Sequence, residues 1–434
     1  MPLTDLTRFD RVVSNLRVDA TVSATEIESA GARCLQSSTD DLLGLAADVR
    51  VREAAIGAIR KFGLAPGAAT RLREELESRL SRHLAVEAAA LLPDLRLLDA
   101  LPGRVAAEGR TARRLDLIAS EILAVDDLGG SARGQLFVTD AIHPFEGDLT
   151  PLPQLIERAQ RDHALVISIE ALGLGVLGTT GGGVAEHLGI AGQLDLQVLS
   201  LSALGGHGWV LAGRRALVEA ARAFTAPAPS LASVAATLRA LEILQTEPQR
   251  RSRAFDVGQR LLNVLRDQGL DTGPCVTPWV PVWVGEESLT EEWLRAMAEG
   301  GIAGRALLAG KHSRLLFSPA ATISDAQLDS LLETLSRVAR KLPIADSSTS
   351  RARVTISRVG SFVMSAPCAP KWVELETRER VTEPEAAAHA RTLSNRVFDA
   401  VETLTWRAAN LRSTRLPGTD AIRALIDRTR NRRG

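Results

Sequence analysis

The chain has 434 residues, 45% of them apolar, and its 52 basic side chains balance its 52 acidic ones. Single cores rarely grow beyond about 250–300 residues, so this length predicts two packed domains with an appendage. Balanced charge excludes a global field that would attract nucleic acid or an anionic membrane. No apolar run approaches the roughly 18–20 residues of a membrane span, and the polar start is not that of a signal peptide. Three scattered cysteines predict neither zinc sites nor disulfides, hence a reduced, cytoplasmic protein.

The first part of the chain is predicted to be helical. Residues 1–30 have the composition of a polar helical arm. Apolar residues then recur at helical spacing from Asp48 to Lys61, and Phe62-Gly63 follows as a plausible C-cap. A second amphipathic helix is predicted from Ala69 to Leu84, because leucines recur on one of its faces.

From about residue 135, short apolar strands alternate with helices. Strands are predicted over 136–138, 165–169, 196–201 and 209–212, with a helix over 151–163. Such alternation indicates an α/β domain with a mostly parallel sheet.

A smaller domain is predicted after the long helix 231–245. Its expected strands and helices cover residues 279–284, 293–297, 314–317 and 328–338. The predicted organisation is an N-terminal helical arm (1–60), a large domain (61–228), a small domain (229–345), and a linker with a basic, partly helical extension (346–434). A helix is expected near 385–411 of this extension, which is a candidate surface for a protein partner.

Five motifs occur in order along the chain. They are Thr39-Asp-Asp-Leu-Leu-Gly-Leu45, Phe62-Gly-Leu-Ala-Pro-Gly-Ala-Ala-Thr-Arg71, Phe145-Glu-Gly-Asp-Leu-Thr-Pro-Leu152, Glu170-Ala-Leu-Gly-Leu-Gly-Val-Leu-Gly178 and Leu201-Ser-Ala-Leu-Gly-Gly-His-Gly-Trp-Val-Leu-Ala-Gly213. Their order and spacing over residues 35–342 resemble the α-oxoamine synthases, within fold type I of the pyridoxal-phosphate enzymes. This resemblance implies a large domain with a mostly parallel sheet, a smaller α+β domain, and a dimer with active sites at the subunit boundary.

The resemblance also shows where the family's catalytic groups would fall. Its Schiff-base lysine falls on Ser202, whose hydroxyl cannot form an imine. The aspartate that pairs with the pyridinium nitrogen falls on Ile169, and a neighbouring histidine falls on Leu172. The arginine that grips a substrate carboxylate falls on Leu316, with Arg314 only two residues away.

The phosphate cradle departs from the family as well. Where fold type I enzymes place a turn of small residues at a helix N-terminus, this chain has Asp94, which would repel a phosphate. About 60 residues of the family's pattern are missing between positions 92 and 135. Asp94, Ile169, Ser202 and His207 are therefore predicted to line a vestigial pocket.

Three weaker patterns were weighed against ordinary structural roles. Gly173, Gly175 and Gly178 form a G-x-G-x-x-G string, but no helix starts directly at it, so a turn is favoured over a nucleotide site. Ser202 and His207 suggest a serine nucleophile, yet there is no G-x-S-x-G elbow and no third member. The histidines lack metal-ligand spacing, and no metal site is predicted.

The main hypothesis is a catalytically inactive, pseudoenzyme-like protein that acts as a structural, dimerisation or regulatory subunit and needs no cofactor. It would form a homodimer, or a heterodimer with an active paralogue. One alternative is an active pyridoxal-phosphate-dependent acyltransferase or aminotransferase-like enzyme with a displaced lysine, although Lys61, Lys311, Lys341 and Lys371 offer no obvious substitute. The other is a small-ligand-binding protein that uses the remodelled pocket.

Overall fold

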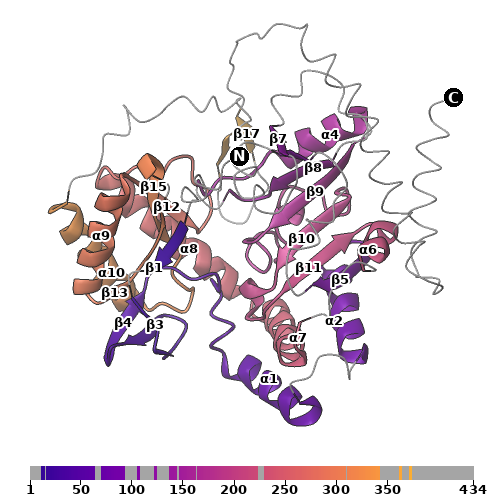
Figure 1. Ribbon diagram of the computed structural model, residues 1–434, viewed down its shortest axis with the longest axis horizontal. Coiled ribbons are helices and arrows are strands. Elements are labelled where there is room, and N and C mark those ends of the chain that lie inside the picture. Colours follow the sequence, from indigo (N-terminus) through magenta and orange to yellow (C-terminus); the bar gives the residue numbers. More distant parts are fainter. Residues whose placement is uncertain are drawn as a thin grey trace, which may run out of the picture.

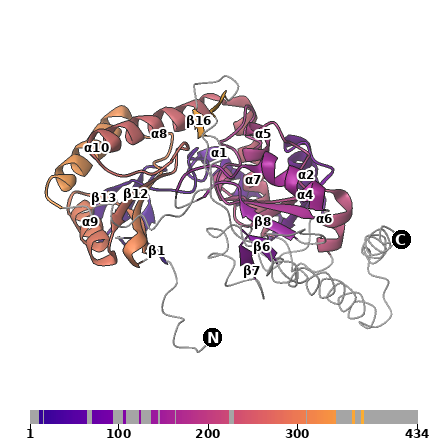
Figure 2. The same cartoon turned by 90° about the horizontal axis from the view of Figure 1, so that it is seen from above.

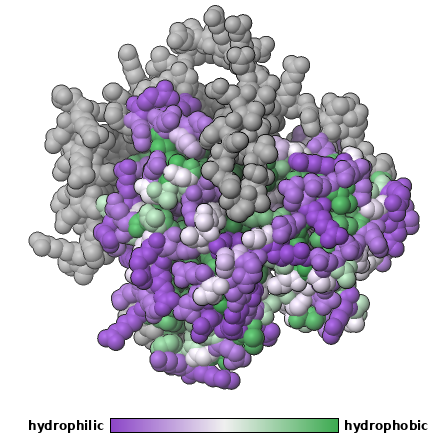
Figure 3. Space-filling view, turned by 180° about the vertical axis from the view of Figure 1, so that it is seen from behind, coloured by the Kyte–Doolittle hydropathy of each residue, from purple (hydrophilic) through white to green (hydrophobic). Residues whose placement is uncertain are grey.

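The computed structural model describes residues 11–14, 16–63, 70–92, 105–107, 122–124, 136–143, 146–162, 164–222, 229–308, 310–342, 361–363 and 371–373. Its helices and strands form two lobes, which lie side by side in Figure 1 and again in the perpendicular view of Figure 2. The lobe built on the longest sheet is called the large lobe, and the other the small lobe. The surface seen in Figure 3 is mostly hydrophilic, with scattered apolar patches, as expected when the apolar side chains form the cores.

A seven-stranded sheet forms the centre of the large lobe. Its order is β5-β11-β10-β9-β8-β6-β7, with β5 (Ala88–Leu92), β6 (Val105–Ala107), β7 (Ile122–Ala124), β8 (Leu136–Asp140), β9 (Leu165–Glu170), β10 (Leu196–Ser200) and β11 (Trp209–Gly213). Strands β7, β6, β8, β9 and β10 are parallel to one another, and β11 is antiparallel to both its neighbours. The predicted mostly parallel sheet is therefore confirmed.

Helices bury both faces of this sheet, which explains why its strands consist mostly of apolar residues. The large lobe contains α1 (Val49–Phe62), α2 (Thr70–His83), α4 (Leu152–Asp162), α5 (Val184–His187), α6 (Arg215–Arg222) and α7 (Leu231–Thr246). Along β9, Val166 belongs to the core on one face, whereas Ile167 and Ile169 belong to the core on the other. Helix α1 packs along α7 at the end of the lobe.

The small lobe contains two four-stranded sheets with helices packed against them. Helix α8 (Gln249–Asp267) leads into this lobe, which also contains α9 (Glu287–Glu299) and α10 (Asp325–Ala339) (Figure 2). One sheet has the order β1-β14-β15-β12, with β1 (Arg11–Ser14), β12 (Val280–Gly285), β14 (Arg305–Leu308) and β15 (Ser313–Phe317). The other has the order β13-β4-β3-β2, with β2 (Ala20–Thr21), β3 (Glu26–Ser29), β4 (Ala32–Gln36) and β13 (Ile302–Ala303).

The prediction of a helical arm over residues 1–30 is wrong for the part of this segment that the structure describes, because residues 11–14, 20–21 and 26–29 form strands of the small lobe. Strand β1 pairs with β14, and β4 pairs with β13. Ala30 and Gly31 form the two-residue turn between β3 and β4, both with positive φ, which is the geometry of a type I′ hairpin. In β3, Ile27 and Ser29 are buried whereas Glu28 is exposed, so the true periodicity is two.

The remaining predicted helices and strands up to residue 342 lie close to their expected positions, and within the extension the structure describes residues 361–363 and 371–373. Strands β16 (Ser361–Val363) and β17 (Lys371–Val373) pair antiparallel in the extension. The helix expected near 385–411 lies outside the described residues. Among the described helices, none combines the length and apolar character needed to cross a membrane.

Candidate functional site

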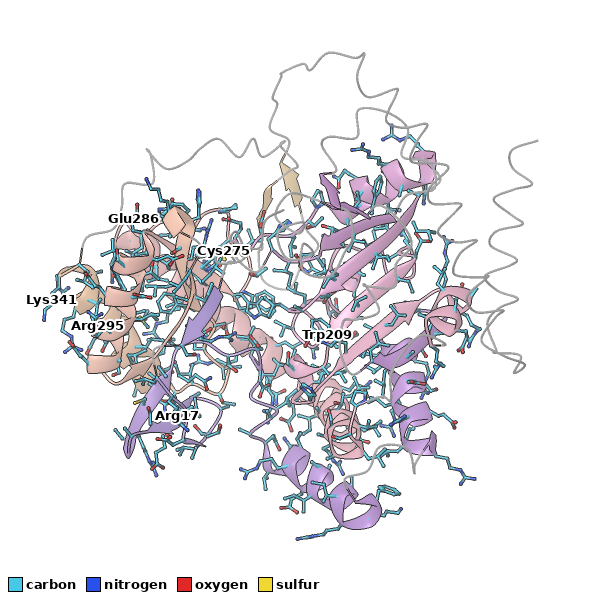
Figure 4. All side chains as sticks on the ribbon, in the orientation of Figure 1. Arg17, Trp209, Cys275, Glu286, Arg295 and Lys341 are labelled. Carbon is cyan, nitrogen blue, oxygen red and sulfur yellow. The ribbon has the colours of Figure 1, made fainter. Side chains whose placement is uncertain are left out.

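A cavity of about 270 Å³ is lined by residues from both lobes. The ends of β10 and β11 and the loop after β9 contribute from the large lobe, while β12, β14 and β15 contribute from the small lobe. The segment after β4 supplies Ser38 and Asp40. In Figure 4, Trp209, one of the lining residues, lies at the start of β11 near the boundary between the lobes. A second hollow, of about 490 Å³, lies beside α1 and carries none of the predicted site residues.

The cavity brings together three of the positions identified from the sequence, namely Ser202, Leu172 and Leu316. Ile169 does not line it and is 3% exposed within the sheet core. His207 does not line it either, and its backbone N–H donates to Ser233 Oγ at 2.6 Å. Asp94 lies outside the described residues, so its predicted place in the pocket stays a prediction.

Two serine hydroxyls meet where β10 ends. Ser202 begins the short 3-10 helix η4 (Ser202–Leu204), and its Oγ lies 2.7 Å from Ser200 Oγ. The turn closes at Gly205, where φ is 66° and a Cβ atom would collide with the backbone of Ala46. No histidine or carboxylate among the described residues bonds to either hydroxyl. The pair can therefore bind a polar ligand atom, but it lacks the base that a serine nucleophile requires.

A buried carboxyl group holds the loop that carries Leu172 into the cavity. Glu170 is 2% exposed, and the backbone N–H of Val184 at the start of α5 donates to both of its oxygens, at 3.1 and 3.2 Å. Burial raises the pKa of Glu170 to about 8, even though the hydrogen bond from Val184 acts in the opposite direction. Gly173 and Gly183 both pack directly on this carboxyl group. The loop from Ala171 to Gly183 therefore packs around the buried carboxyl group of Glu170.

The same loop explains the glycine string. Glu186 accepts hydrogen bonds from the backbone N–H groups of Thr180 and Gly182, at 2.9 and 2.7 Å. Gly178 also packs against this carboxylate. A bound phosphate would need the N–H groups of Thr180 and Gly182, which already donate to the Glu186 carboxylate. This supports the interpretation of the G-x-G-x-x-G string as a turn.

One ion pair lies at the cavity, and sequence reasoning missed it. Arg305 of β14 donates through Nη1 to Asp40 Oδ1 at 2.8 Å. Arg305 is also the direct cross-strand partner of Leu316. Only the β14–β15 register reveals this relationship, because the two residues are eleven positions apart in sequence. Arg314, the arginine two residues before Leu316, does not line the cavity. Its Nη2 donates to Glu146 Oε1 at 2.5 Å, and its guanidinium lies over the ring of Trp283.

The described lining does not fit a covalently held pyridoxal phosphate. Covalent attachment needs a primary amine, yet Lys61, Lys311 and Lys341 all lie away from the cavity lining. Figure 4 shows Lys341 on the outer side of the small lobe. Ile169 offers no carboxylate for a ring nitrogen. For the fourth lysine, Lys371, the structure describes the backbone in β17 and not the side chain. Within the described part of the chain, no group of three or more potential ligand side chains could hold a metal ion.

The chain is similar in sequence to 8-amino-7-oxononanoate synthases. No protein-family model matches the chain. The 8-amino-7-oxononanoate synthase of Anaeromyxobacter dehalogenans is 33% identical over 359 residues, covering 74% of this chain and 90% of that protein. The 8-amino-7-oxononanoate synthase of Thermosipho melanesiensis is 29% identical over 353 residues, covering 72% of this chain and 90% of that protein.

Solved structures agree on the fold. Serine palmitoyltransferase from Sphingomonas wittichii matches with a TM-score of 0.69 at 20% identity, covering 76% of this chain and 93% of its own. A serine palmitoyltransferase from S. paucimobilis, with one lysine replaced by alanine and a PLP–myriocin aldimine bound, matches with a TM-score of 0.68 at 20% identity, covering 75% and 92%. The predicted fold type I architecture is confirmed.

Two predictions are overturned by these relatives. The hypothesis of a catalytically inactive pseudoenzyme is contradicted, because the chain matches proteins named as synthases over 90% of their length. The expectation of no cofactor is contradicted by the neighbour that holds PLP. That expectation rested on the residues that replace the family's groups at Ser202, Ile169, Leu316 and Asp94, and such replacements do not by themselves exclude the cofactor. In that neighbour, PLP remains bound although a lysine has been replaced by alanine.

Proposed function

Since the chain belongs to the α-oxoamine synthase family, within fold type I of the pyridoxal-phosphate enzymes, we propose that it is an acyl-transferring enzyme whose site is the cavity between its lobes. The observation that carries this proposal is the convergence of Ser202, Leu172 and Leu316 on one cavity. These residues come from three separate segments of the chain, which the family's motifs place at the reaction centre. The names of the relatives support the same class of reaction.

The amine that this chemistry requires has to come from outside the described cavity lining. The side chains of Lys61, Lys311 and Lys341 are described, and none of them lines the cavity. By elimination, we assign the role to Lys371 on β17. This assignment also gives the C-terminal extension a purpose, since the extension would complete a site that the two lobes leave without an amine.

Borohydride trapping tests the assignment. The full-length chain is incubated with pyridoxal phosphate, reduced, digested and mapped by mass spectrometry. We expect one reduced adduct, on Lys371, and its loss in Lys371→Ala. Lys311→Ala is the matched control and should keep the adduct, because Lys311 does not line the cavity. Retention of the label in Lys371→Ala, or equal labelling of all four lysines, would disprove the assignment.

A second candidate is a small-ligand-binding protein, favoured by the charged pair in a cavity whose described lining contains no amine. The two candidates differ in turnover. An enzyme should consume substrate in stoichiometric excess over protein, and it should lose this activity in Lys371→Ala. A binding protein should show saturable ligand binding without turnover.

We also propose that the chain forms a dimer, with a second copy or with a paralogue, and that it works in the cytoplasm. The outer side of α1 exposes Val49, Ile56 and Ile59, with exposed fractions of 67%, 36% and 40%, and these apolar side chains suit a contact with a second subunit. Light scattering of the purified chain should give twice the mass of one chain, and Ile56→Glu/Ile59→Glu should give a monomer. A monomeric wild-type chain would leave only the heterodimer to be sought in the native host.

A further inference from the structure

We propose that Arg305 is the anion-binding residue of the cavity, that the indole N–H of Trp279 donates to the same ligand, and that this ligand is a small organic carboxylate. The inference rests on the proposed function in so far as both place a ligand in this cavity. It goes further by naming the ligand's chemistry and the residues that recognise it. Neither residue stands at a position that the family's motifs mark.

The first observation is the state of the Arg305 guanidinium. Its side chain is 29% exposed, and Nη1 donates to Asp40, whose side chain is 51% exposed. A guanidinium carries five N–H donors in a rigid fork that matches a carboxylate. Among the described residues, Asp40 is the one recorded partner of this fork, through one oxygen. Because exposed ion pairs are weak, a ligand carboxylate can share or replace that contact.

The second observation is an unpaired donor in the cavity wall. Trp279 lines the cavity and is 5% exposed, and its Nε1 atom is buried without an acceptor among the described residues. Buried polar groups nearly always have a hydrogen-bond partner, so an orphaned donor in a cavity wall points to an acceptor on a bound molecule. Arg305 and Trp279 therefore supply independent signals for an oxygen-bearing ligand.

The third observation is where the charge lies. Arg305 and Leu316 are paired across β14 and β15, so their side chains point to the same face of the sheet, with Cβ atoms about 4.5–5.5 Å apart. Both residues line the cavity. Leu316 stands where the family's arginine would fall, and the cation Arg305 lies beside it on the neighbouring strand β14. Arg314 cannot serve instead, because Glu146 and the ring of Trp283 hold it elsewhere.

The remaining walls limit the ligand's body. Leu172, Trp209, Leu316 and Phe317 present apolar surface, and the Ser200–Ser202 pair presents hydroxyls. The volume of about 270 Å³ lies just below the range of about 300–1,000 Å³ that is typical of sites for drug-sized ligands. A short aliphatic carboxylate fits these features, with its charge at Arg305 and its chain against the apolar wall.

Calorimetric titration of the full-length chain with acetate, butyrate and octanoate, each compared with its own amide, tests the proposal. We expect at least one carboxylate to bind about tenfold or more tightly than its amide, because charge-assisted hydrogen bonds are roughly twice as strong as neutral ones. Arg305→Gln should abolish this preference. Binding of every carboxylate no tighter than its amide would overturn the proposal.

Four further variants separate ligand recognition from a structural role. Trp279→Phe should weaken carboxylate binding several-fold, whereas Trp283→Phe should not. The Trp283 N–H is also buried and unpaired among the described residues, but Trp283 does not line the cavity.

The double variant Arg305→Ala/Leu316→Arg moves the cation to the neighbouring strand and should restore the preference for carboxylates over amides. The charge swap Asp40→Arg/Arg305→Asp keeps the ion pair and should still lose that preference. Equal effects of the two tryptophan changes, or a swap variant that binds normally, would contradict the inference.

The outcome also separates this inference from the proposed function. If carboxylates fail to bind while Lys371 is labelled by pyridoxal phosphate and borohydride, the assignment of Arg305 falls and the enzyme proposal stands. If carboxylates bind through Arg305 while no lysine is labelled and no substrate is consumed, the enzyme proposal falls and the carboxylate site stands.

Discussion

Replacing Gly183 by alanine is expected to lower the free energy of unfolding by about 3–5 kcal/mol. Gly183 has φ 90° and ψ −162°, a region that is essentially restricted to glycine. Its Cβ atom would also overlap the Glu170 carboxyl group, which is 2% exposed and receives its hydrogen bond from Val184. The change therefore adds backbone strain to the displacement of a buried acid. Urea unfolding followed by circular dichroism measures the loss.

Gly189 provides the matched control. Its φ of 70° is also positive, but a Cβ atom there would meet nothing within 4 Å. Gly189→Ala should therefore cost only the left-handed backbone strain of about 1–2 kcal/mol. If the two variants were equally stable, the packing of the loop around Glu170 would not be as described.

The second large effect concerns the pH dependence of stability. The pKa of Glu170 rises from 4.5 to about 8 on folding, mainly through burial. A raised folded-state pKa means that the native state holds a proton which the unfolded chain releases. The stabilisation is therefore complete below about pH 4.5 and is lost as the pH rises towards 8. The shift corresponds to a change on the order of 5 kcal/mol.

Glu170→Gln removes this titration and should gain stability relative to the wild type as the pH rises from 4.5 to 8. The measurement is the difference between the two unfolding free energies at each pH. Burial also raises the pKa of Asp41, to about 6, but this group is present in both proteins and cancels in the difference. Glu53→Gln, on the exposed surface of α1, should follow the wild-type curve. A flat difference curve for Glu170→Gln would show that the carboxyl group is not held neutral.

Gly183→Ala is expected to affect the cavity as well as stability. The loop between Glu170 and Gly183 carries Ala171 and Leu172 into the cavity wall. A loop folded around a buried neutral acid keeps this wall fixed, which a site for a small ligand needs. Loosening the loop is expected to weaken ligand binding together with stability.

The sequence allowed the large lobe to be predicted because its signals are local. The strand at 165–169 is apolar apart from Ser168, since helices cover both faces of the sheet. The glycine turn before Trp209 marks the return strand. The N-terminal strands were missed because Glu26–Ser29 is short and partly polar. The alternation of buried and exposed side chains in this strand depends on the hairpin that Ala30-Gly31 closes.

The site was predictable only in part. Motif order placed Ser202, Leu172 and Leu316, and these converge on one cavity. It could not place Arg305, whose relation to Leu316 depends on strand register, nor the orphaned N–H of Trp279, which depends on burial. The incorrect expectations of inactivity and of no cofactor came from judging individual positions without the rest of the chain.

A crystal structure of the full-length chain grown with pyridoxal phosphate would show whether the cofactor binds in the cavity. We expect the cofactor between the lobes, beside Ser202, Trp209 and Leu316, with continuous density to Lys371. Cofactor bound elsewhere on the chain, or an empty cavity at saturating pyridoxal phosphate, would contradict the claim that this cavity is the site of an acyl-transferring enzyme.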